Sequence, residues 1–253
     1  MGDYLMNVNK SKSNNSIKEL FKTLLIAGSI AIFFRSIFFE PFNIPSGSMI
    51  PSLLVGDYLF VSKYSYGYSK YSFPFGIVPI TDRIFEKSPK RGDIIVFRKP
   101  GDETIDYIKR LVALPNDTVQ VKNGVLYINK KMVERTKSNV GVMKNNFGDE
   151  KIFTQYKETF DGLNFHEIIE ASDQDLFDDT IEFKVPDNHF FFMGDNRDNS
   201  RDSRSPEVGF VPKRNLIGKA QIIFFSHNSS ASIFEFWKWH KAIRFSRIGK
   251  AIE

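Results

Sequence analysis

The feature that most restricts this chain is an apolar stretch that follows a basic N-terminus. The segment TLLIAGSIAIFF, residues 23–34, contains no charged side chain, and Lys10, Lys12, Lys18 and Lys22 precede it. With its flanks it extends over Leu20–Phe39, close to the roughly 20 residues that a helix needs to cross a bilayer. This length requires the side chains of Lys22 and Arg35 to extend to the lipid headgroups. The sequence therefore predicts an N-terminal tail over residues 1–19 and a transmembrane anchor over residues 20–39.

Two other interpretations of this stretch fit less well. A cleaved signal peptide also has a basic start and a short apolar centre, but it ends in small residues, whereas this run ends in FFRSIFFEPF, residues 33–42. A buried helix of a soluble protein would show polar residues on one face, and this run has almost none. The lysines before an uncleaved anchor indicate that the N-terminus is cytoplasmic. We therefore expect a single-pass protein of the cytoplasmic membrane, with everything after residue 40 on the extracytoplasmic (periplasmic) face.

Composition narrows the remaining possibilities. The 253 residues suffice for one large or two modest domains. The formal net charge of +5 suggests nucleic acid or anionic lipid as a neighbour without choosing between them. The chain contains no cysteine, which excludes disulfides and cysteine-ligated zinc.

Short apolar runs bounded by turn signals predict a mainly β fold after the anchor. Strands are expected at residues 56–63, 91–97, 104–114 and 216–226, with a hairpin over residues 118–129 that Asn123-Gly124 closes. The polar segment at residues 130–186 is less regular and is interpreted as an insertion. No internal repeat is present.

Two serines stand in a loop that prolines bracket, PSGSMIP, residues 45–51. A serine is a poor nucleophile until a base removes its proton. None of the four histidines stands in a context typical of a catalytic triad. His166-Glu167 resembles the start of a zinc-protease motif, but Glu170 occupies the place of the second histidine. Ser48 by itself is equally consistent with a helix cap or an ordinary turn.

A lysine is the alternative base, and it needs an apolar environment. The free pKa of a lysine is about 10.4 and burial lowers it. In TIDYIKRLVAL, residues 104–114, strand alternation places Lys109 as the single charge on a face with Ile105, Tyr107, Leu111 and Ala113. Most lysines in strands are nevertheless exposed, so alternation alone leaves an ordinary role open. Lys63 is a rival that we expect to be solvated, because it ends its strand.

The loop GDNRDNSRDSR, residues 194–204, has many alternating charges. Counted from Asp195, it lacks the glycine at position six and the glutamate at position twelve of a calcium-binding loop. We instead expect its charged residues to pair among themselves and to present Ser200 in a fixed place. These residues are Asp195, Arg197, Asp198, Asp202 and Arg204.

Four segments, in this order, closely resemble the sequence boxes of the bacterial type I signal peptidases, also called leader peptidases. They are PSGSMIPSLLVGDYL, RGDIIVF, DYIKRLVALPND and MGDNRDNSRDSR, and the anchor lies upstream of the first, as it does in that family. Four ordered boxes are a far more specific signal than any single short motif. The resemblance covers roughly residues 39–97, 106–121 and 191–223.

The resemblance implies a membrane-bound serine endopeptidase that removes N-terminal signal peptides from exported preproteins, cutting after small-x-small (Ala-x-Ala-like) sequences. Ser48 would be the nucleophile and Lys109 the general base, with an oxyanion hole from the Ser46 hydroxyl and the Ser48 backbone N–H. Ser200 would orient Lys109. Four residues would brace the active-site loops: Arg110, Asp195, Asp202 and Arg204. The matches to the substrate pockets are Phe42, Ile44, Met49, Leu53, Val96, Tyr107 and Ile108.

The resemblance also implies a fold and a set of partners. A β catalytic core would comprise residues 40–117 and 187–226, with a smaller inserted β subdomain at residues 118–186 and a basic, aromatic tail at residues 227–253. The expected partners are preprotein signal peptides and the lipid bilayer, with no nucleic acid, metal or cofactor. Contact with the export machinery is compatible with this role but is not indicated by the sequence.

Alternatives remain for the whole chain and for its tail. A self-cleaving repressor also uses a serine/lysine pair, but it would carry a helix-turn-helix domain where this chain has an anchor. A membrane-tethered binding module would leave the serine loop inert and use the basic tail as its ligand site. The tail itself resembles a segment that rests on lipid headgroups, and a solvated basic tail with its tryptophans packed on the core is an equal alternative. Its relevant residues are Trp237, Trp239, Lys238, Lys241, Arg244 and Arg247.

Overall fold

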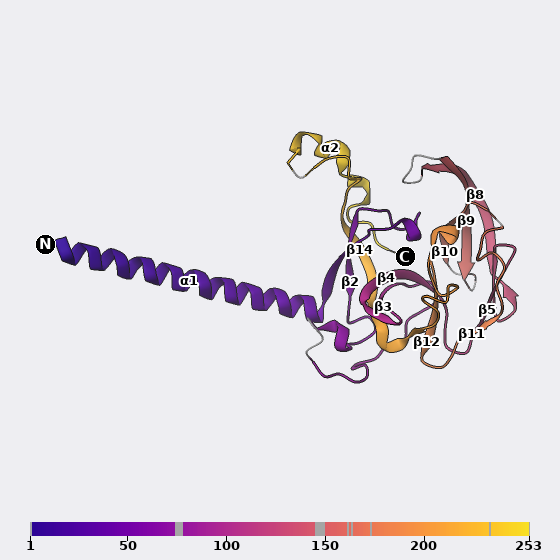
Figure 1. The fold of residues 1–253 in the computed structure, drawn as a ribbon, viewed down its shortest axis with the longest axis horizontal. Coiled ribbons are helices and arrows are strands. Elements are labelled where there is room, and N and C mark those ends of the chain that lie inside the picture. Colours follow the sequence, from indigo (N-terminus) through magenta and orange to yellow (C-terminus); the bar gives the residue numbers. More distant parts are fainter. Residues whose placement is uncertain are drawn as a thin grey trace.

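A computed structural model describes residues 2–73, 78–144, 150–160, 162, 164–172, 174–232 and 234–252. One long helix projects from a body built of three β-sheets (Figure 1). The mainly β fold that the sequence predicts is confirmed, and each predicted strand is found within a few residues of its expected place.

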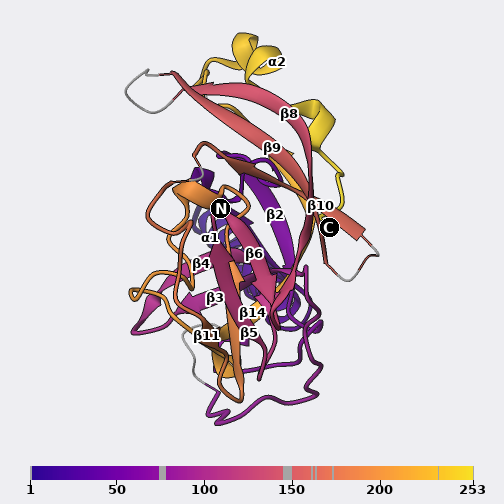
Figure 2. The same cartoon turned by 90° about the vertical axis from the view of Figure 1, so that its right-hand side faces the viewer.

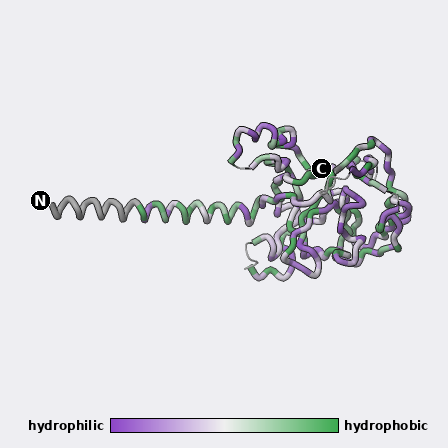
Figure 3. Tube along the Cα trace, turned by 45° about the horizontal axis from the view of Figure 1, so that its top comes forward, coloured by the Kyte–Doolittle hydropathy of each residue, from purple (hydrophilic) through white to green (hydrophobic). Residues whose placement is uncertain are grey.

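The N-terminal helix α1 spans Gly2–Ile37. Its segment Ile17–Ile37 is long and apolar enough to cross a membrane, and it is the one helix among the described residues with that property. The side chains from Ile17 to Arg35 are exposed and not covered by the rest of the protein, as those of a helix surrounded by lipid would be. Figure 3 shows the hydrophobic residues gathered along this part of the helix, up to the point where it enters the body.

The predicted anchor extends two residues too far. α1 ends at Ile37, and Phe39 begins strand β1 (Phe39–Asn43), which is antiparallel to β2 (Asp57–Ser62). The Phe39 ring packs against Tyr64 with 5.6 Å between ring centroids. Arg35, which is expected to extend towards the lipid headgroups, donates through its Nε to Glu40 at 2.9 Å, and its side chain is 59% exposed.

The largest sheet has seven antiparallel strands in the order β1-β2-β14-β3-β4-β12-β13. Strands β1 and β2 have been given above. The other five are β3 (Ile94–Lys99), β4 (Asp102–Ala113), β12 (His189–Met193), β13 (Val211–Pro212) and β14 (Leu216–Ser226). Strands from both ends of the chain therefore alternate in one sheet.

Two smaller sheets come from the residues between β4 and β12. One has the order β11-β5-β6-β7, with β5 (Thr118–Lys122), β6 (Val125–Ile128), β7 (Lys131–Met132) and β11 (Phe183–Lys184). The other has the order β10-β9-β8, with β8 (Glu134–Lys144), β9 (Glu150–Phe160) and β10 (Asn164–Glu170). In Figure 2 the long β8–β9 ribbon arches over one end of the body.

The predicted division at residue 118 does not follow a break in the hydrophobic core. Val112 and Phe191 of the large sheet lie in the same buried cluster as Val121 and Leu126 of the small one. Burial of a shared apolar surface holds the two sheets together. The division into a core and an inserted subdomain therefore stays a prediction.

The C-terminal residues fold back onto the large sheet. They form the short helix α2 (Trp239–Ala242) between two 3-10 turns, Phe236–Lys238 and Phe245–Arg247. The Arg247 guanidinium donates to the buried Asp57 carboxylate of β2 at 2.6 Å, and Ala251 forms a β-bridge with Ile222 of β14. The end of the chain is thus part of the fold.

Candidate active site

The serine loop lies just after β1, and Ser48 stands in a single 3-10 turn, Gly47–Met49. A second loop holds this turn in place. The backbone N–H of Asn196 donates to the Ser48 carbonyl at 3.1 Å, and the Asn196 side-chain amide donates to the Gly47 carbonyl at 3.0 Å. Two segments almost 150 residues apart in sequence therefore fix the direction of the Ser48 hydroxyl.

Lys109 lies on β4 and reaches that hydroxyl. Its Nζ is 2.6 Å from Ser48 Oγ and 3.0 Å from the Ile108 carbonyl oxygen. The lysine is only 5% exposed, and Ser48 is 7% exposed. This burial lowers the pKa of Lys109 to about 8, although the charges of Asp202 and Asp195 oppose the shift. An amine in that state is neutral in part of the molecules at neutral pH.

Two further serines lie close to this pair. Ser46 Oγ is 3.4 Å from Ser48 Oγ, and Ser46 is exposed. Ser200 is buried beside Asp202 and Gly194. Among the hydrogen bonds of the described residues, none joins the Ser200 hydroxyl to the Lys109 amine, so the predicted orienting contact is not formed in this geometry.

Sequence reasoning gave Gly194 no role, yet the site depends on it. A side-chain carbon at this position would lie 2.3 Å from Ser200 Oγ and 2.5 Å from the Ser48 carbonyl oxygen. Only glycine lets these two serines approach from both sides. Its place directly after the apolar run HFFFM, residues 189–193, was the available signal.

The residues expected to brace the loops form two buried ion pairs. Arg110 donates to both carboxylate oxygens of Asp195, at 2.8 and 2.9 Å. Arg204 does the same to Asp202, at 2.9 Å to each oxygen. Burial raises the pKa of Asp202, but the charge of Arg204 and the hydrogen bonds from Arg204 and the Gly194 backbone together outweigh burial, and the pKa falls below its usual value.

The expectation that the charged residues of this loop pair among themselves is correct only for Asp202 and Arg204. Asp195 pairs with Arg110 of β4, and Arg197 pairs with Glu158 of β9. These partners stand more than 35 positions away in sequence, so a pattern confined to the loop could not show them. The loop is therefore tied to both the large sheet and the three-stranded sheet.

Lys63 is not the solvated lysine that its position at a strand end suggested. It is 2% exposed, pairs with Glu40 at 2.8 Å and donates to the Ser72 carbonyl at 2.6 Å. Burial lowers its pKa, but no serine hydroxyl is among its hydrogen-bond partners in the described residues. Of the two buried lysines, Lys109 is the one beside a hydroxyl.

Six of the seven predicted pocket residues belong to one apolar cluster next to the serine loop. Met49, Leu53, Val96 and Ile44 are buried in this cluster, and the half-buried Phe42 and Ile108 pack against it. Tyr107 instead packs against a different cluster, and its ring lies 5.3 Å from the Lys109 Nζ.

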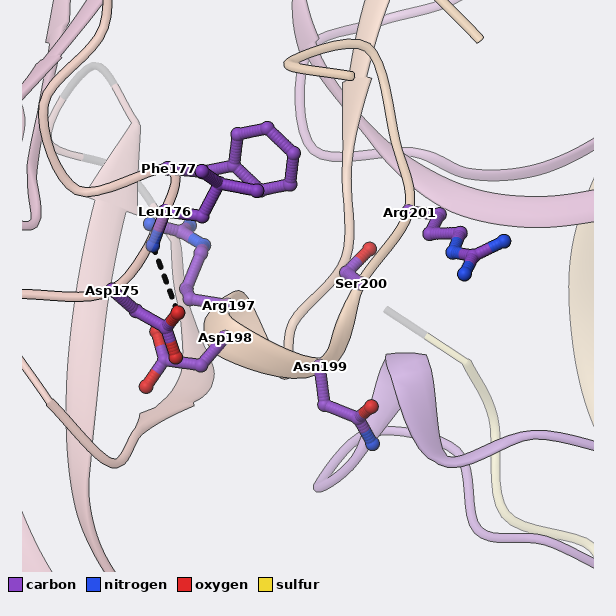
Figure 4. A pocket seen from close by; sticks show the side chains of 8 residues that line it. All are labelled: Asp175, Leu176, Phe177, Arg197, Asp198, Asn199, Ser200 and Arg201. Atoms are coloured by element: carbon purple, nitrogen blue, oxygen red, sulfur yellow. Dashed lines mark hydrogen bonds between the residues drawn. The ribbon is translucent and has the colours of Figure 1, made fainter. Parts of the chain in front are cut away.

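Two cavities border the serine loop and the 197–201 turn. A groove of about 710 Å³ runs beside Ser46, Gly47 and Ile50, with β8 and β9 forming its other side through residues that include Met143, Lys151 and Phe153. A smaller cavity of about 260 Å³ lies behind the turn that bears Ser200 (Figure 4). The groove is the larger of the two and lies along the loop that carries Ser48, with Ser46 and Gly47 among its lining residues.

Comparison with known proteins identifies the family. The family model described as signal peptidase, peptidase S26, matches residues 17–225. The chain belongs to this family. It is 40% identical to a signal peptidase I of Rickettsia typhi, with 97% of each chain covered. It is 43% identical to a signal peptidase I of Rickettsia conorii over 86% of this chain and 83% of that one. A crystal structure of a signal peptidase I from Enterococcus faecalis is 26% identical and covers 53% of this chain and 97% of that one, with a TM-score of 0.30.

The protein is therefore a serine peptidase of the signal peptidase I type, which removes signal peptides from preproteins. Membership of this membrane-bound family agrees with the apolar helix at the N-terminus. The matched residues 17–225 include the apolar helix segment Ile17–Ile37 and both members of the hydrogen-bonded pair, Ser48 and Lys109.

Proposed function

We propose that this signal peptidase cuts its substrates with a Ser48/Lys109 dyad. The observation that supports this most directly is the 2.6 Å hydrogen bond between a buried amine and a hydroxyl. A general base must lie within hydrogen-bond reach of the proton that it removes, and Lys109 does. Its lowered pKa supplies the neutral amine that this step requires.

The proposed reaction has two halves. Neutral Lys109 takes the proton of Ser48 while Oγ attacks the scissile carbonyl carbon, and the resulting ammonium then protonates the leaving amine as the C–N bond breaks. The signal peptide remains as an ester on Ser48. Lys109, neutral again, next takes a proton from water as its oxygen attacks the ester, and returns it to Ser48 Oγ as the acid leaves.

The negative charge that forms on the carbonyl oxygen needs donors. We assign this role to the Ser48 backbone N–H and the Ser46 hydroxyl, which stands 3.4 Å from Ser48 Oγ at the edge of the groove. Removal of one such donor typically lowers kcat by about 10²–10³-fold. Ser46→Ala should therefore lower kcat to this extent with an unchanged Tm, and wild-type turnover would contradict the assignment.

The apolar cluster next to Ser48 suits small substrate side chains. Met49 and Leu53 have no exposed surface, so the interior of the cluster is already filled and would not admit a large substrate side chain. We therefore propose cleavage after small-x-small sequences, as the family resemblance implies. A preprotein whose last signal-peptide residue is changed from alanine to leucine should be cut far more slowly.

The geometry of the chain also suits a substrate held in a bilayer. Ser48 stands only eleven positions after the end of α1 at Ile37, which is at most about 40 Å of extended chain. We propose that the N-terminus is cytoplasmic and that the body lies on the extracytoplasmic face. Preproteins anchored by their own signal peptide would then be concentrated near the groove.

Cleavage of a preprotein by the full-length protein in detergent tests the dyad. Ser48→Ala and Lys109→Met should abolish it. Lys63→Met is the matched control, because Lys63 is equally buried but pairs with Glu40, and cleavage should persist in that variant. Capture of the preprotein without cleavage would instead indicate a binding module.

A further inference from the structure

Three acidic side chains from separate segments meet behind the 197–199 turn. They are Glu170 at the end of β10, Asp178 in the segment before β11, and Asp198 in the 3-10 turn Arg197–Asn199. One carboxylate oxygen of each lies within 4.8 Å of the other two. Glu170 is 3% exposed and Asp178 is 2% exposed, so these groups are not an ordinary solvated acidic surface.

Two oxygens of this cluster lack a hydrogen-bond partner among the described residues. Oε1 of Glu170 and Oδ1 of Asp198 are shielded from water and accept no hydrogen bond there. The second oxygen of each group is satisfied: Glu170 Oε2 accepts from Arg135 at 2.6 Å, and Asp198 Oδ2 accepts from the backbone N–H of Ala171 at 2.7 Å. Shielded carboxylate oxygens without partners are strongly unfavourable, and either protonation of the group or a bound cation relieves them.

The charges around the cluster do not cancel. Arg135 pairs with Glu170, but the other two nearby guanidinium groups are bound elsewhere, Arg197 by Glu158 and Arg204 by Asp202. With all three carboxyls ionised, the cluster and its one directly paired arginine carry a net charge of about −2. A doubly positive ion would neutralise it.

We propose that Glu170, Asp178 and Asp198 bind a divalent cation, and that this cation is Ca²⁺. All three ligands are carboxylate oxygens, which hard cations prefer. Three oxygens that all lie within 4.8 Å of one another can share one ion at Ca–O distances of about 2.3–2.6 Å. Ca²⁺ tolerates an irregular set of ligands, whereas Mg²⁺ demands near-ideal octahedral geometry and gives up its waters reluctantly.

The smaller cavity gives such an ion access to water. Asp198 lines this cavity of about 260 Å³ together with Asp175 and Arg197, and Figure 4 shows Ser200 and Arg201 at its other end. Calcium takes six to eight oxygen ligands. Water molecules from the cavity would complete its coordination next to the three carboxylates.

Cation binding would connect the three-stranded sheet to the serine loop. Glu170 belongs to β10, and Asp198 stands two residues after Asn196, which holds the carbonyls of Gly47 and Ser48. An ion between Glu170 and Asp198 would therefore fix the turn that positions Ser48. We expect a site of structural stabilisation, which does not depend on the proposed dyad.

Thermal unfolding of the full-length protein in detergent, after treatment with a chelator and its removal, tests this inference. At a CaCl₂ concentration 100-fold above the Kd, the Tm should rise by about 5 °C, and calorimetric titration with CaCl₂ should show one site. An equal concentration of MgCl₂ should raise the Tm less. No rise in Tm and no binding heat would overturn the proposal.

Two variants locate the effect. Glu170→Gln and Asp198→Asn each remove one ligand charge and should each abolish the Ca²⁺-dependent rise in Tm. Asp179→Asn is the matched control, because it removes the same charge one residue from Asp178 on an exposed side chain and should keep the full rise. The same rise in all three variants would mean non-specific binding and would overturn the site. If one ligand variant does not fold, the other and the titration of the wild-type protein decide.

Discussion

At the scale of single residues, the important property is the charge state of Lys109. Water stabilises an ammonium far better than a protein interior does, so burial favours the neutral amine. The nearby carboxylates of Asp202 and Asp195 limit this effect, and the pKa settles at about 8. Each carboxylate is itself held by an arginine, which keeps its charge from restoring the ordinary pKa of a lysine.

The pH dependence of cleavage follows from this pKa. The active form of Lys109 is neutral, so kcat/KM for a preprotein should rise about tenfold per pH unit below pH 8 and level off above it. The value of kcat/KM rises with pH because a higher pH deprotonates more of the Lys109 ammonium and so increases the fraction of neutral amine. The Ser46→Ala variant should show a lower plateau with the same midpoint. A midpoint near pH 10, where an ordinary lysine titrates, would contradict the lowered pKa of Lys109.

Gly194 allows a second prediction at this scale. In Gly194→Ala the new methyl group would meet Ser200 Oγ at 2.3 Å and the Ser48 carbonyl oxygen at 2.5 Å. Because the serine loop must move, we expect kcat/KM to fall about 100-fold and the free energy of unfolding to fall by about 1–3 kcal/mol. Gly28→Ala, whose methyl group would contact nothing within 4 Å, is the control. Unchanged kcat/KM in Gly194→Ala would contradict the role of this glycine.

Alternation along one strand made Lys109 a candidate, because every second residue of a strand lies on the same face and the neighbours of Lys109 on that face are apolar. The same logic was wrong for Lys63, since its partner Glu40 lies on a different strand and no local pattern shows it. Gly194 and Asn196 were missed for a similar reason: their importance comes from contacts with Gly47 and Ser48, far away in sequence. The residues that make up the site could be predicted from the sequence, but the contacts between segments far apart in the chain could not.

At the scale of elements, the 194–204 loop depends on anchors in two sheets. Arg110 of β4 holds Asp195, and Glu158 of β9 holds Arg197, with all four side chains buried. A strand pattern predicts where β4 lies, but it does not show that Arg110, on the face opposite Lys109, is only 2% exposed. The element was therefore predicted correctly and its second face was not, because that face is covered by the loop.

The Arg110–Asp195 pair gives a prediction at this scale. Asp195→Leu leaves a buried guanidinium without its main counter-charge and should lower the free energy of unfolding by about 3–5 kcal/mol. The double variant Arg110→Met/Asp195→Leu should be less destabilised than Asp195→Leu, because neither charge remains. Urea unfolding of the full-length protein measures both.

An exposed pair provides the control for that cycle. Lys70 and Glu103 are paired at 2.9 Å with both side chains more than 40% exposed, so Glu103→Gln should cost at most about 1 kcal/mol. If the losses in free energy of unfolding of the two single variants simply added up in the double variant, Arg110 and Asp195 would not be coupled. The pair would then not explain how the 194–204 loop is held.

At the scale of the whole molecule, two apolar surfaces lie on the same side of the body: the helix α1 and the aromatic residues around α2. Figure 1 shows α2 at the end from which α1 leaves. Around α2 the large side chains of Phe234, Phe236 and Trp237 are all more than half exposed. The folding of the tail back onto Asp57 and β14 holds this aromatic surface against the body. Aromatic rings next to Lys and Arg are typical of segments that lie at the lipid headgroups.

The tail gives the last prediction, because it contains both tryptophans of the chain, Trp237 and Trp239. Tryptophan fluorescence of the full-length protein in vesicles therefore reports on this segment alone. If the tail rests on the bilayer, lipids brominated on the upper part of their acyl chains should quench this fluorescence strongly. Trp237→Phe should remove most of the quenching, since Trp237 is 58% exposed, and Trp239→Phe less, since Trp239 is 40% exposed and donates to the Ser232 carbonyl at 3.3 Å. Equal emission in brominated and ordinary lipids would place the tail in water and leave α1 as the membrane contact at this end of the molecule.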